Sequence, residues 1–400
     1  MTPPYRLATP LLVALGLPAC YLSYRETSER DAGPDRADAP IDTADVSDGA
    51  PDDADPPACD ALRVAGALAL DDAPASSVTP RLVALPDHGV GVVTVSTDGD
   101  PTRVLYERLD PALGRTIGPV TVATDSFTWA EPALAGAGLL IAFGLAGDED
   151  TMLVPVTFDG APAGTRFTVP LTHPSIFRPS RSGFFWLAFV MRTDNSFQLA
   201  HLAADGTLLH EPVVIDAGRY GSGHGAVARP DGASHVVTYP REGPPGVRNG
   251  YVNALTESGV PGPERQLGEA GDGPVQPVRL GDALVLVRSG DDALILERTD
   301  FGTLERLDRV TYPPAPTRPI AGAVSDRLLI AYTIPGTLRI DDYGTELVPV
   351  ATLDVPLPAS SLGPGWSVAE GPGALYLALS IVEGSRSYPW IVRVECAGAR

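Results

Sequence analysis

Lysine is absent from this 400-residue chain: all 29 basic residues are arginine, and they are set against 50 acidic residues. The absence of lysine indicates a GC-rich genome rather than a mechanism. The shortage of positive charge leaves a formal net charge of −21, which argues against nucleic acids and anionic membrane surfaces as partners. Cations and basic proteins remain compatible with so acidic a surface.

Histidine and cysteine are also scarce, with six histidines and three cysteines in the chain. The histidines are His88, His173, His201, His210, His224 and His235. None forms a His-x-x-x-His pair or lies beside a cysteine, so a zinc site has little support. There is also no Gly-x-Ser-x-Gly turn, and no glycine-rich phosphate loop precedes a helix. The sequence therefore identifies no catalytic centre.

The first 20 residues combine a short apolar run with a cysteine. Residues 7–17 carry no charge, and the run is too short to span a bilayer but suits the apolar core of a signal peptide. With Leu17, Ala19 and Cys20, this segment resembles the bacterial lipoprotein signal. The resemblance implies that residues 1–19 are removed, that Cys20 is lipidated, and that the protein is held at the cell envelope. Tyr21, rather than aspartate, follows Cys20, which favours the outer membrane by analogy. The alternatives are an ordinary secretory signal or an uncleaved buried segment.

An acidic segment follows the predicted anchor. Residues 21–58 contain eleven acidic residues against three arginines, with much alanine and proline. Such a composition buries too little apolar surface to offset its ordering entropy, so residues 20–58 are predicted to be an unfolded tether. Residues 59–400 form the predicted folded domain.

A repeated pattern dominates the rest of the chain. A strongly apolar, strand-length run, bounded by Gly, Pro or Asp, recurs at the spacing of a four-stranded propeller blade. The seven runs are Gly91–Ser96, Leu139–Leu145, Phe184–Met191, His235–Tyr239, Ala283–Val287, Leu328–Thr333 and Leu375–Ile381. In this pattern the region resembles the degenerate propeller repeats of exported proteins of predatory and soil bacteria. The predicted fold is an all-β, seven-bladed propeller.

A second marker repeats in phase with the first, at the turn after the third strand of the first five units. Its members are Asp110-Pro111, Asp159-Gly160, Asp205-Gly206, Glu257-Ser258-Gly259 and Asp300-Phe301-Gly302. Asp and Gly suit the positive φ of tight turns. In the sixth unit two phases compete: either Arg339–Tyr343 is the third strand, or it is a loop and Val348–Leu353 is the strand. The second is favoured, because Val348-Pro349-Val350 echoes Val154-Pro155-Val156.

The seventh unit ends one strand short. Its three predicted strands are Trp366–Glu370, Leu375–Ile381 and Trp390–Glu395. The unassigned run Leu62–Leu70 fills the vacancy if the amino-terminal segment completes the last blade. That arrangement brings Cys59 beside Cys396, and a disulfide between them replaces the missing hairpin. The alternative is a pair of β-sandwiches with an incidental cysteine pair.

Acidic residues concentrate in the loops that form the usual ligand face of a propeller. They are Asp98, Asp100, Asp148, Glu149, Asp150, Asp194, Asp291, Asp292, Asp341 and Asp342. Converging carboxylates bind a hard cation such as calcium, but no spacing here matches a calcium loop. Solvated turn charges are the favoured interpretation, and no cofactor is expected.

Aromatic residues recur where the chain enters five of the predicted blades, at Trp129, Phe177, Tyr220, Tyr312 and Trp366. They form either a stacking rim for a sugar or peptide or part of the packing between blades, and the packing role is favoured. His224, in a glycine-rich run, is the best histidine candidate for ligand contact, against the alternative of a flexible loop.

These observations favour a lipid-anchored binding or scaffolding module, expected to be monomeric, with a protein or glycan ligand. The candidate ligand-binding residues are Trp129, Tyr220, His224, Trp366, Asp98, Asp148, Asp150 and Asp194. One alternative is a carbohydrate hydrolase or lyase that uses funnel carboxylates. Another is a structural envelope protein without a ligand.

Overall fold

The folded part of the chain consists of β-strands. The computed structural model describes residues 59–71, 80–97, 101–125, 127–145, 151–169, 174–179, 185–190, 197–202, 207–209, 211–216, 225–229, 235–242, 248–256, 260–269, 275–359 and 361–397. Contacts group residues 55–400 into one compact unit. Within the described residues, no helix is long and apolar enough to cross a membrane.

The strands form seven four-stranded antiparallel sheets. The first three sheets, each from its inner to its outer strand, are β2 (Arg81–Ala84), β3 (Val90–Ser96), β4 (Arg103–Leu109) and β5 (Arg115–Thr124); β6 (Phe127–Ala135), β7 (Gly138–Leu145), β8 (Thr151–Thr157) and β9 (Phe167–Val169); and β10 (Pro174–Pro179), β11 (Phe185–Val190), β12 (Phe197–Leu202) and β13 (Val213–Asp216).

The next three are β14 (Gly225–Ala228), β15 (His235–Glu242), β16 (Arg248–Leu255) and β17 (Pro261–Glu269); β18 (Gln276–Leu280), β19 (Ala283–Ser289), β20 (Leu294–Thr299) and β21 (Arg306–Tyr312); and β22 (Ile320–Val324), β23 (Arg327–Ile334), β24 (Thr337–Tyr343) and β25 (Pro349–Pro356). The last sheet is β26 (Ser361–Gly371), β27 (Ala374–Glu383), β28 (Arg386–Ala397) and β1 (Ala61–Ala69).

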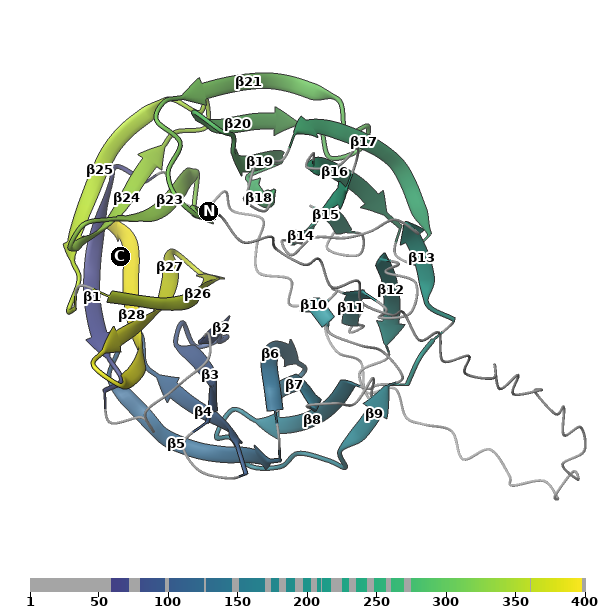
Figure 1. The fold of residues 1–400 in the computed structure, drawn as a ribbon, viewed down its shortest axis with the longest axis vertical. Helices are drawn as coiled ribbons and strands as arrows, with labels where there is room; N and C mark the ends of the chain where they lie inside the picture. Colours follow the sequence, from purple (N-terminus) through teal and green to yellow (C-terminus); the bar gives the residue numbers. More distant parts are fainter. Residues whose placement is uncertain are drawn as a thin grey trace, which may run out of the picture. The chain divides into compact units, whose positions relative to one another are not determined.

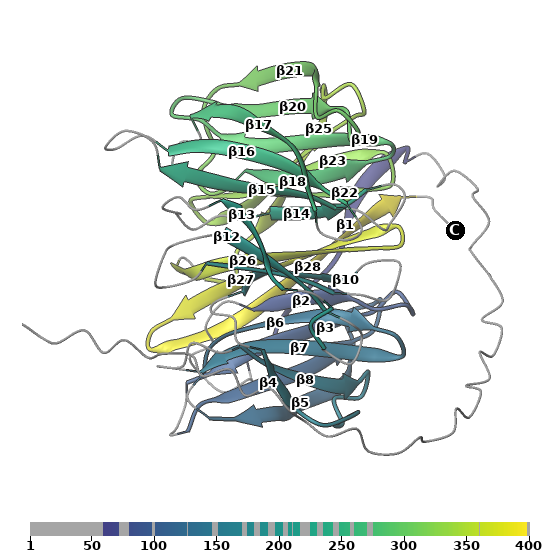
Figure 2. The same ribbon diagram turned by 90° about the vertical axis from the view of Figure 1, so that its right-hand side faces the viewer.

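The sheets close into a ring. The inner strands β2, β6, β10, β14, β18, β22 and β26 contact one another in that order, and β26 returns to contact β2. Figure 1 shows the sheets arranged radially around this centre, and Figure 2 shows them from the side. This arrangement is a propeller, and it excludes the pair of β-sandwiches considered above.

Packing between neighbouring sheets explains the apolar runs in the sequence. In β3, for example, every residue is buried, because side chains on both faces of a middle strand meet a neighbouring sheet. Outer strands such as β25 have one face in solvent and are largely exposed. All seven apolar runs predicted from the sequence are therefore second strands of their sheets.

The amino-terminal strand completes the last sheet, as predicted. Strand β1 pairs antiparallel with β28, with Leu62 opposite Cys396. Cys59 and Cys396 form the predicted disulfide, with Cα atoms 5.4 Å apart. A buried arginine attaches this junction to the neighbouring sheet, since Arg327 Nη1 donates a hydrogen bond to the carbonyl oxygen of Cys59 at 3.0 Å. The ring therefore closes through backbone pairing, one covalent bond and contacts with β23.

The phase favoured from the sequence for the sixth unit is wrong. The third strand is β24, which contains Arg339–Tyr343, and residues 349–356 form the outer strand β25. The reason lies in burial: Leu338 and Ile340 are fully buried, whereas Val348 and Val350 are 57% and 55% exposed. Val348-Pro349-Val350 lies at the exposed outer strand, whereas Val154-Pro155-Val156 lies in a buried third strand. Their similar sequences therefore do not indicate equivalent positions.

A repeated leucine in the turns after the third strands was not predicted. Leu113, Leu304 and Leu347 have φ of 63°, 59° and 57°, and all three are buried in clusters between sheets. Because a positive φ is unfavourable for leucine, burial of the side chain must offset the strain. These turns therefore help to join neighbouring sheets as well as to reverse the chain.

Candidate functional site

Most of the ligand-binding residues predicted from the sequence lie outside the described residues. They are Tyr220, His224, Asp98, Asp148, Asp150 and Asp194, together with the predicted lipidation site Cys20. Trp129 and Trp366 are described, and so are Asp291, Asp292, Asp341 and Asp342 from the acidic set.

The two tryptophans pack between sheets. Trp129 is partly buried against the cluster shared by β6–β9 and β10–β13, and a Cβ added to Gly144 would lie 2.3 Å from its indole Nε1. Trp366 packs against the cluster shared by the last sheet and β22–β25. Both positions agree with the packing role that the sequence favoured.

The acidic residues divide into different environments. Asp342, expected in a loop, is instead a fully buried residue of β24 whose Oδ1 accepts a hydrogen bond from Arg327 Nε at 2.9 Å. Burial raises the pKa of Asp342, and the bonds from Arg327 oppose that rise. Among the described residues, no group of three or more histidine, cysteine, aspartate or glutamate side chains is placed to hold a metal ion. Asp342 therefore belongs to the sheet interior and does not face a ligand.

A groove opens between the sheets β18–β21 and β22–β25. Its volume is about 260 Å³. The described residues that line it are Leu294, Tyr312, Pro313, Pro314, Ala315, Pro316, Thr317, Tyr332, Thr333, Ile334, Asp341 and Tyr343. Leu294 follows the loop between second and third strands, and residues 313–317 connect one sheet to the next. Loops between second and third strands and connections between sheets form the usual ligand face of a propeller, so the groove opens where the sequence predicted ligands to bind.

Two hydrogen bonds hold the proline-rich side of the groove in place. The backbone N–H of Ala315 donates to the carbonyl oxygen of Asp292 at 3.1 Å, and the Ser289 hydroxyl donates to the carbonyl oxygen of Pro316 at 3.0 Å. Proline also fixes φ at three positions of this connection. The connection between the sheets is therefore a preorganised wall.

The partly exposed Tyr312, Tyr332 and Asp341, with the buried Tyr343 beneath them, complete the lining of the groove. The rings of Tyr312 and Tyr343 lie 5.3 Å apart, tilted by 48°. The Tyr312 hydroxyl donates to the carbonyl oxygen of Leu347 at 2.6 Å, and the Tyr332 hydroxyl donates to Asp341 Oδ2 at 2.8 Å. Asp341 Oδ1 accepts a further bond from Thr352, also at 2.8 Å. The protein itself thus fixes the orientation of the two phenols and of the carboxylate.

The titration of the tyrosines reflects this environment. Burial, with the hydrogen bond to Asp341, raises the pKa of Tyr332 to about 12. Burial also raises the pKa of Tyr343, and the negative charge of Asp341 and the nearby Tyr332 and Tyr312 act in the same direction. The hydroxyls of Tyr332 and Tyr343 are therefore protonated and neutral at physiological pH.

A second cavity, of about 390 Å³, lies among the inner strands at the centre of the ring. Its described lining is mostly small and apolar, with Arg279 and Glu370 as its charged residues. Glu370 Oε1 accepts a hydrogen bond from the backbone N–H of Ala323 at 2.8 Å, so it satisfies the open edge of the inner strand β22. This cavity contains fewer groups able to select a ligand than the groove does.

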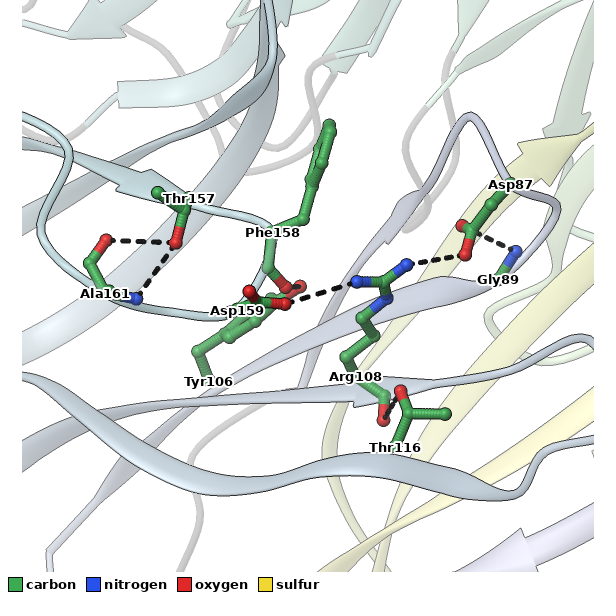
Figure 3. Close-up of polar contacts among 9 residues, drawn as sticks. All are labelled: Asp87, Gly89, Tyr106, Arg108, Thr116, Thr157, Phe158, Asp159 and Ala161. Carbon is green, nitrogen blue, oxygen red and sulfur yellow. Dashed lines mark hydrogen bonds and ion pairs between the residues drawn. The ribbon is translucent and has the colours of Figure 1, made fainter.

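Polar contacts between the turn after β2, strand β4 and the turn after β8 join the first two sheets. Arg108 Nη2 lies 2.6 Å from Asp87 Oδ2 and its Nη1 lies 3.4 Å from Asp159 Oδ1, so the guanidinium bridges the two carboxylates (Figure 3). The Tyr106 hydroxyl donates to the carbonyl oxygen of Phe158 at 3.0 Å. Burial raises the pKa of Tyr106 to about 12. These contacts tie sheet to sheet and leave the groove as the candidate binding site.

The described histidines have structural positions. His88 has φ of 65° and lies in the turn between β2 and β3. Its carbonyl oxygen accepts a hydrogen bond from the Tyr376 hydroxyl of the last sheet. His235 is buried at the start of β15.

Comparisons with known proteins identify the fold and no closer relationship. No protein-family model and no curated protein matches the chain. Among solved structures, Kuenenia stuttgartiensis hydrazine synthase matches with a TM-score of 0.55 and 13% identity, over 82% of this chain and 98% of that one. The Dos1 propeller matches with a TM-score of 0.50 and 12% identity, over 77% of this chain and 75% of that one. At this identity the likeness shows the propeller fold alone.

Proposed function

We propose that this protein is an envelope lipoprotein, anchored through Cys20, whose propeller is a binding or scaffolding module. The observation that carries the binding role is the groove between β18–β21 and β22–β25. It combines a preorganised proline wall with two oriented and partly exposed tyrosines, Tyr312 and Tyr332, and aromatic surfaces with few fixed polar groups are typical of ligand sites. The propeller fold is compatible with such a role.

A binding role is favoured over the carbohydrate hydrolase or lyase considered from the sequence. Glycosidases commonly use two carboxyl groups across the scissile bond. The described lining of the groove contains one acid, Asp341, and both of its oxygens already accept hydrogen bonds from the protein. These committed oxygens suit a fixed electrostatic contact better than proton transfer.

The binding role is tested with the mature protein and a matched pair of variants. Ala315→Arg places a bulky side chain in the groove, whereas Val350→Arg makes the same charge change on the exposed strand β25. Glycan arrays and solubilised envelope fractions are screened for bound partners. We expect partners that Ala315→Arg loses and Val350→Arg retains. Equal binding by both variants would show that the groove is not the binding site.

The anchor is tested separately. Mass spectrometry of the mature protein from its native host should give an amino-terminal Cys20 carrying lipid. Fractionation of the two membranes then tests the proposed outer-membrane location. An amino terminus elsewhere, or an unmodified Cys20, would refute the lipoprotein assignment without bearing on the groove.

A further inference from the structure

Cys59, the first residue that the structure describes, is held from several sides. Its sulfur is bonded to Cys396. Its carbonyl oxygen accepts a hydrogen bond from Arg327 Nη1 at 3.0 Å, and its backbone N–H donates to Asp326 Oδ1 at 3.3 Å. Cys59 is 5% exposed. It is therefore attached covalently to the last sheet and by two hydrogen bonds to the sheet β22–β25.

The arginine at this junction is itself fixed in the protein interior. Arg327 is buried, and its Nε donates to Oδ1 of the fully buried Asp342 at 2.9 Å. A guanidinium paired with a carboxylate away from water resists separation, because each charge would be left buried without its partner. A displacement of the Cys59 carbonyl is thus opposed by β23 and, through Asp342, by β24.

Strand β1 by itself offers little resistance to a pull at its first residues. It has one neighbour in its sheet, β28, and the ladder runs from Leu62 opposite Cys396 to Ala69 opposite Trp390 (Figure 1). A pull on the chain before Leu62 acts at the end of this ladder. Its hydrogen bonds would then break one after another, and each net contribution is small. Without the disulfide, β1 would peel away at low force.

The disulfide moves the same pull onto a strand that is held on both sides. Strand β28 lies between β27 and β1, and its residues Ile391, Val392 and Val394 are fully buried. A displacement of Cys396 must therefore disturb two ladders and expose apolar side chains to water. The load passes to the middle of the last sheet instead of to its outer strand.

We propose that Cys59, Cys396 and Arg327 form a load-bearing attachment between the tether and the propeller. It keeps β1 in the ring when the membrane anchor and a bound partner pull in opposite directions. This inference rests on the proposed anchoring through Cys20 and on the proposed binding role, and it adds a mechanical function to them. A disulfide elsewhere in the ring would stabilise the fold but would not carry this load.

The test is single-molecule force spectroscopy of the mature chain in non-reducing buffer. One handle replaces the lipid at position 20, and the other is joined through a non-natural residue at the exposed position of Thr317. The variant carries Cys59→Ser and Cys396→Ser, so no free thiol remains at the junction. We expect it to release the chain from Cys59 to Arg81 in an early step of up to about 70 Å. Wild type should show no such step below the force at which its sheets unfold.

Two controls separate the load path from general stability. Leu338→Ala keeps the disulfide but removes buried apolar surface, so it should lower the force of sheet unfolding without producing the early step. In the variant that lacks the disulfide, the added pair Arg327→Met and Asp342→Leu leaves no buried charge and should lower the force of the early step. An unchanged force there would exclude the arginine from the attachment.

The outcomes also distinguish this inference from the proposed function. An early step in wild type, or its absence from the variant without the disulfide, would overturn the load-bearing role. If Cys20 carries lipid and wild type shows the early step, the anchor stands and the attachment is refuted. If mass spectrometry finds Cys20 unmodified, the anchor is refuted, and with it the membrane as the source of the load.

Discussion

Single residues at the contacts between sheets determine how closely the sheets approach. Gly160 shows this most clearly, because it has φ of +79° and a Cβ there would lie 2.9 Å from Cδ1 of Tyr106 in the preceding sheet. The position thus requires glycine for two separate reasons, backbone conformation and contact between sheets.

A pair of alanine substitutions separates the two reasons. Gly336 has a similar φ of +75°, but a Cβ added there would meet nothing within 4 Å. We expect Gly336→Ala to lower the free energy of unfolding by about 1 kcal/mol, the cost of a positive φ alone. Gly160→Ala should cost about 1–3 kcal/mol more, through overpacking against Tyr106. Urea unfolding of both variants measures the difference, and equal costs would contradict the contact.

The Asp87–Arg108 pair should make stability depend on pH. The hydrogen bond from Arg108 lowers the pKa of Asp87 below its ordinary value of 3.8. A lowered folded-state pKa adds stability above pH 3.8, and this stability is lost as the pH falls through the folded-state value. Because Asp87 is half exposed, the contribution should be about 1 kcal/mol or less.

The test compares wild type with Asp87→Asn by urea unfolding at neutral pH and near pH 3. The difference in free energy of unfolding between the two proteins should be present at neutral pH and shrink at the lower pH. A difference that stays constant over this range would show that the ion pair does not act through the ionised carboxylate.

At the scale of the strand, the sequence identifies middle strands better than outer ones. Middle strands are buried on both faces, and their sequences are therefore runs of Val, Leu and Ile, as in β3 and β27. An outer strand such as β25 leaves most side chains in solvent. Its residue types therefore say less about its position in the repeat than those of a middle strand do. The misplaced strand of the sixth unit follows from this difference.

Substitutions in the sixth sheet test the corrected phase. Leu338, in β24, is fully buried and packs on both β22–β25 and the last sheet, so Leu338→Ala should cost about 2–5 kcal/mol of unfolding free energy. Val350→Ala, on exposed β25, should change it by about 0.5 kcal/mol or less. The reverse order of the two costs would restore the phase favoured from the sequence.

The groove could be predicted in part. Tyr312 was identified as an aromatic residue at the entrance to a blade, and Asp341 as an acid, although in the wrong element. The site itself was missed, because Tyr332 lies in the apolar run Leu328–Thr333, which indicates core packing, and Tyr343 was assigned to a loop. Their convergence with Pro313–Thr317 depends on how two sheets meet, and no local pattern in the chain contains that information.

The whole molecule depends on how the ring is closed. Pairing of β1 with β28 was predictable, because the last sheet lacked a fourth strand and the two cysteines flanked the segments that would pair there. Arg327, which joins the carbonyl of Cys59 to Asp342, was not predicted. The buried carboxylate and the junction share this one arginine, so closure of the ring is coupled to packing of β22–β25.

Loss of the disulfide should destabilise the ring without preventing β1 from pairing. Cys59→Ser is expected to lower the free energy of unfolding by about 2–4 kcal/mol in non-reducing buffer. In reducing buffer the variant and wild type should unfold at nearly the same temperature. Differential scanning calorimetry under both conditions measures this, and an unchanged midpoint in non-reducing buffer would contradict a stabilising role.

Closure of the ring by its own leading strand is tested most directly by peptide mapping of the folded protein. The thiols are blocked on unfolding without reductant, and the protein is digested and analysed by mass spectrometry. We expect one disulfide-linked pair of peptides, containing Cys59 and Cys396. Recovery of both cysteines as blocked free thiols would contradict it.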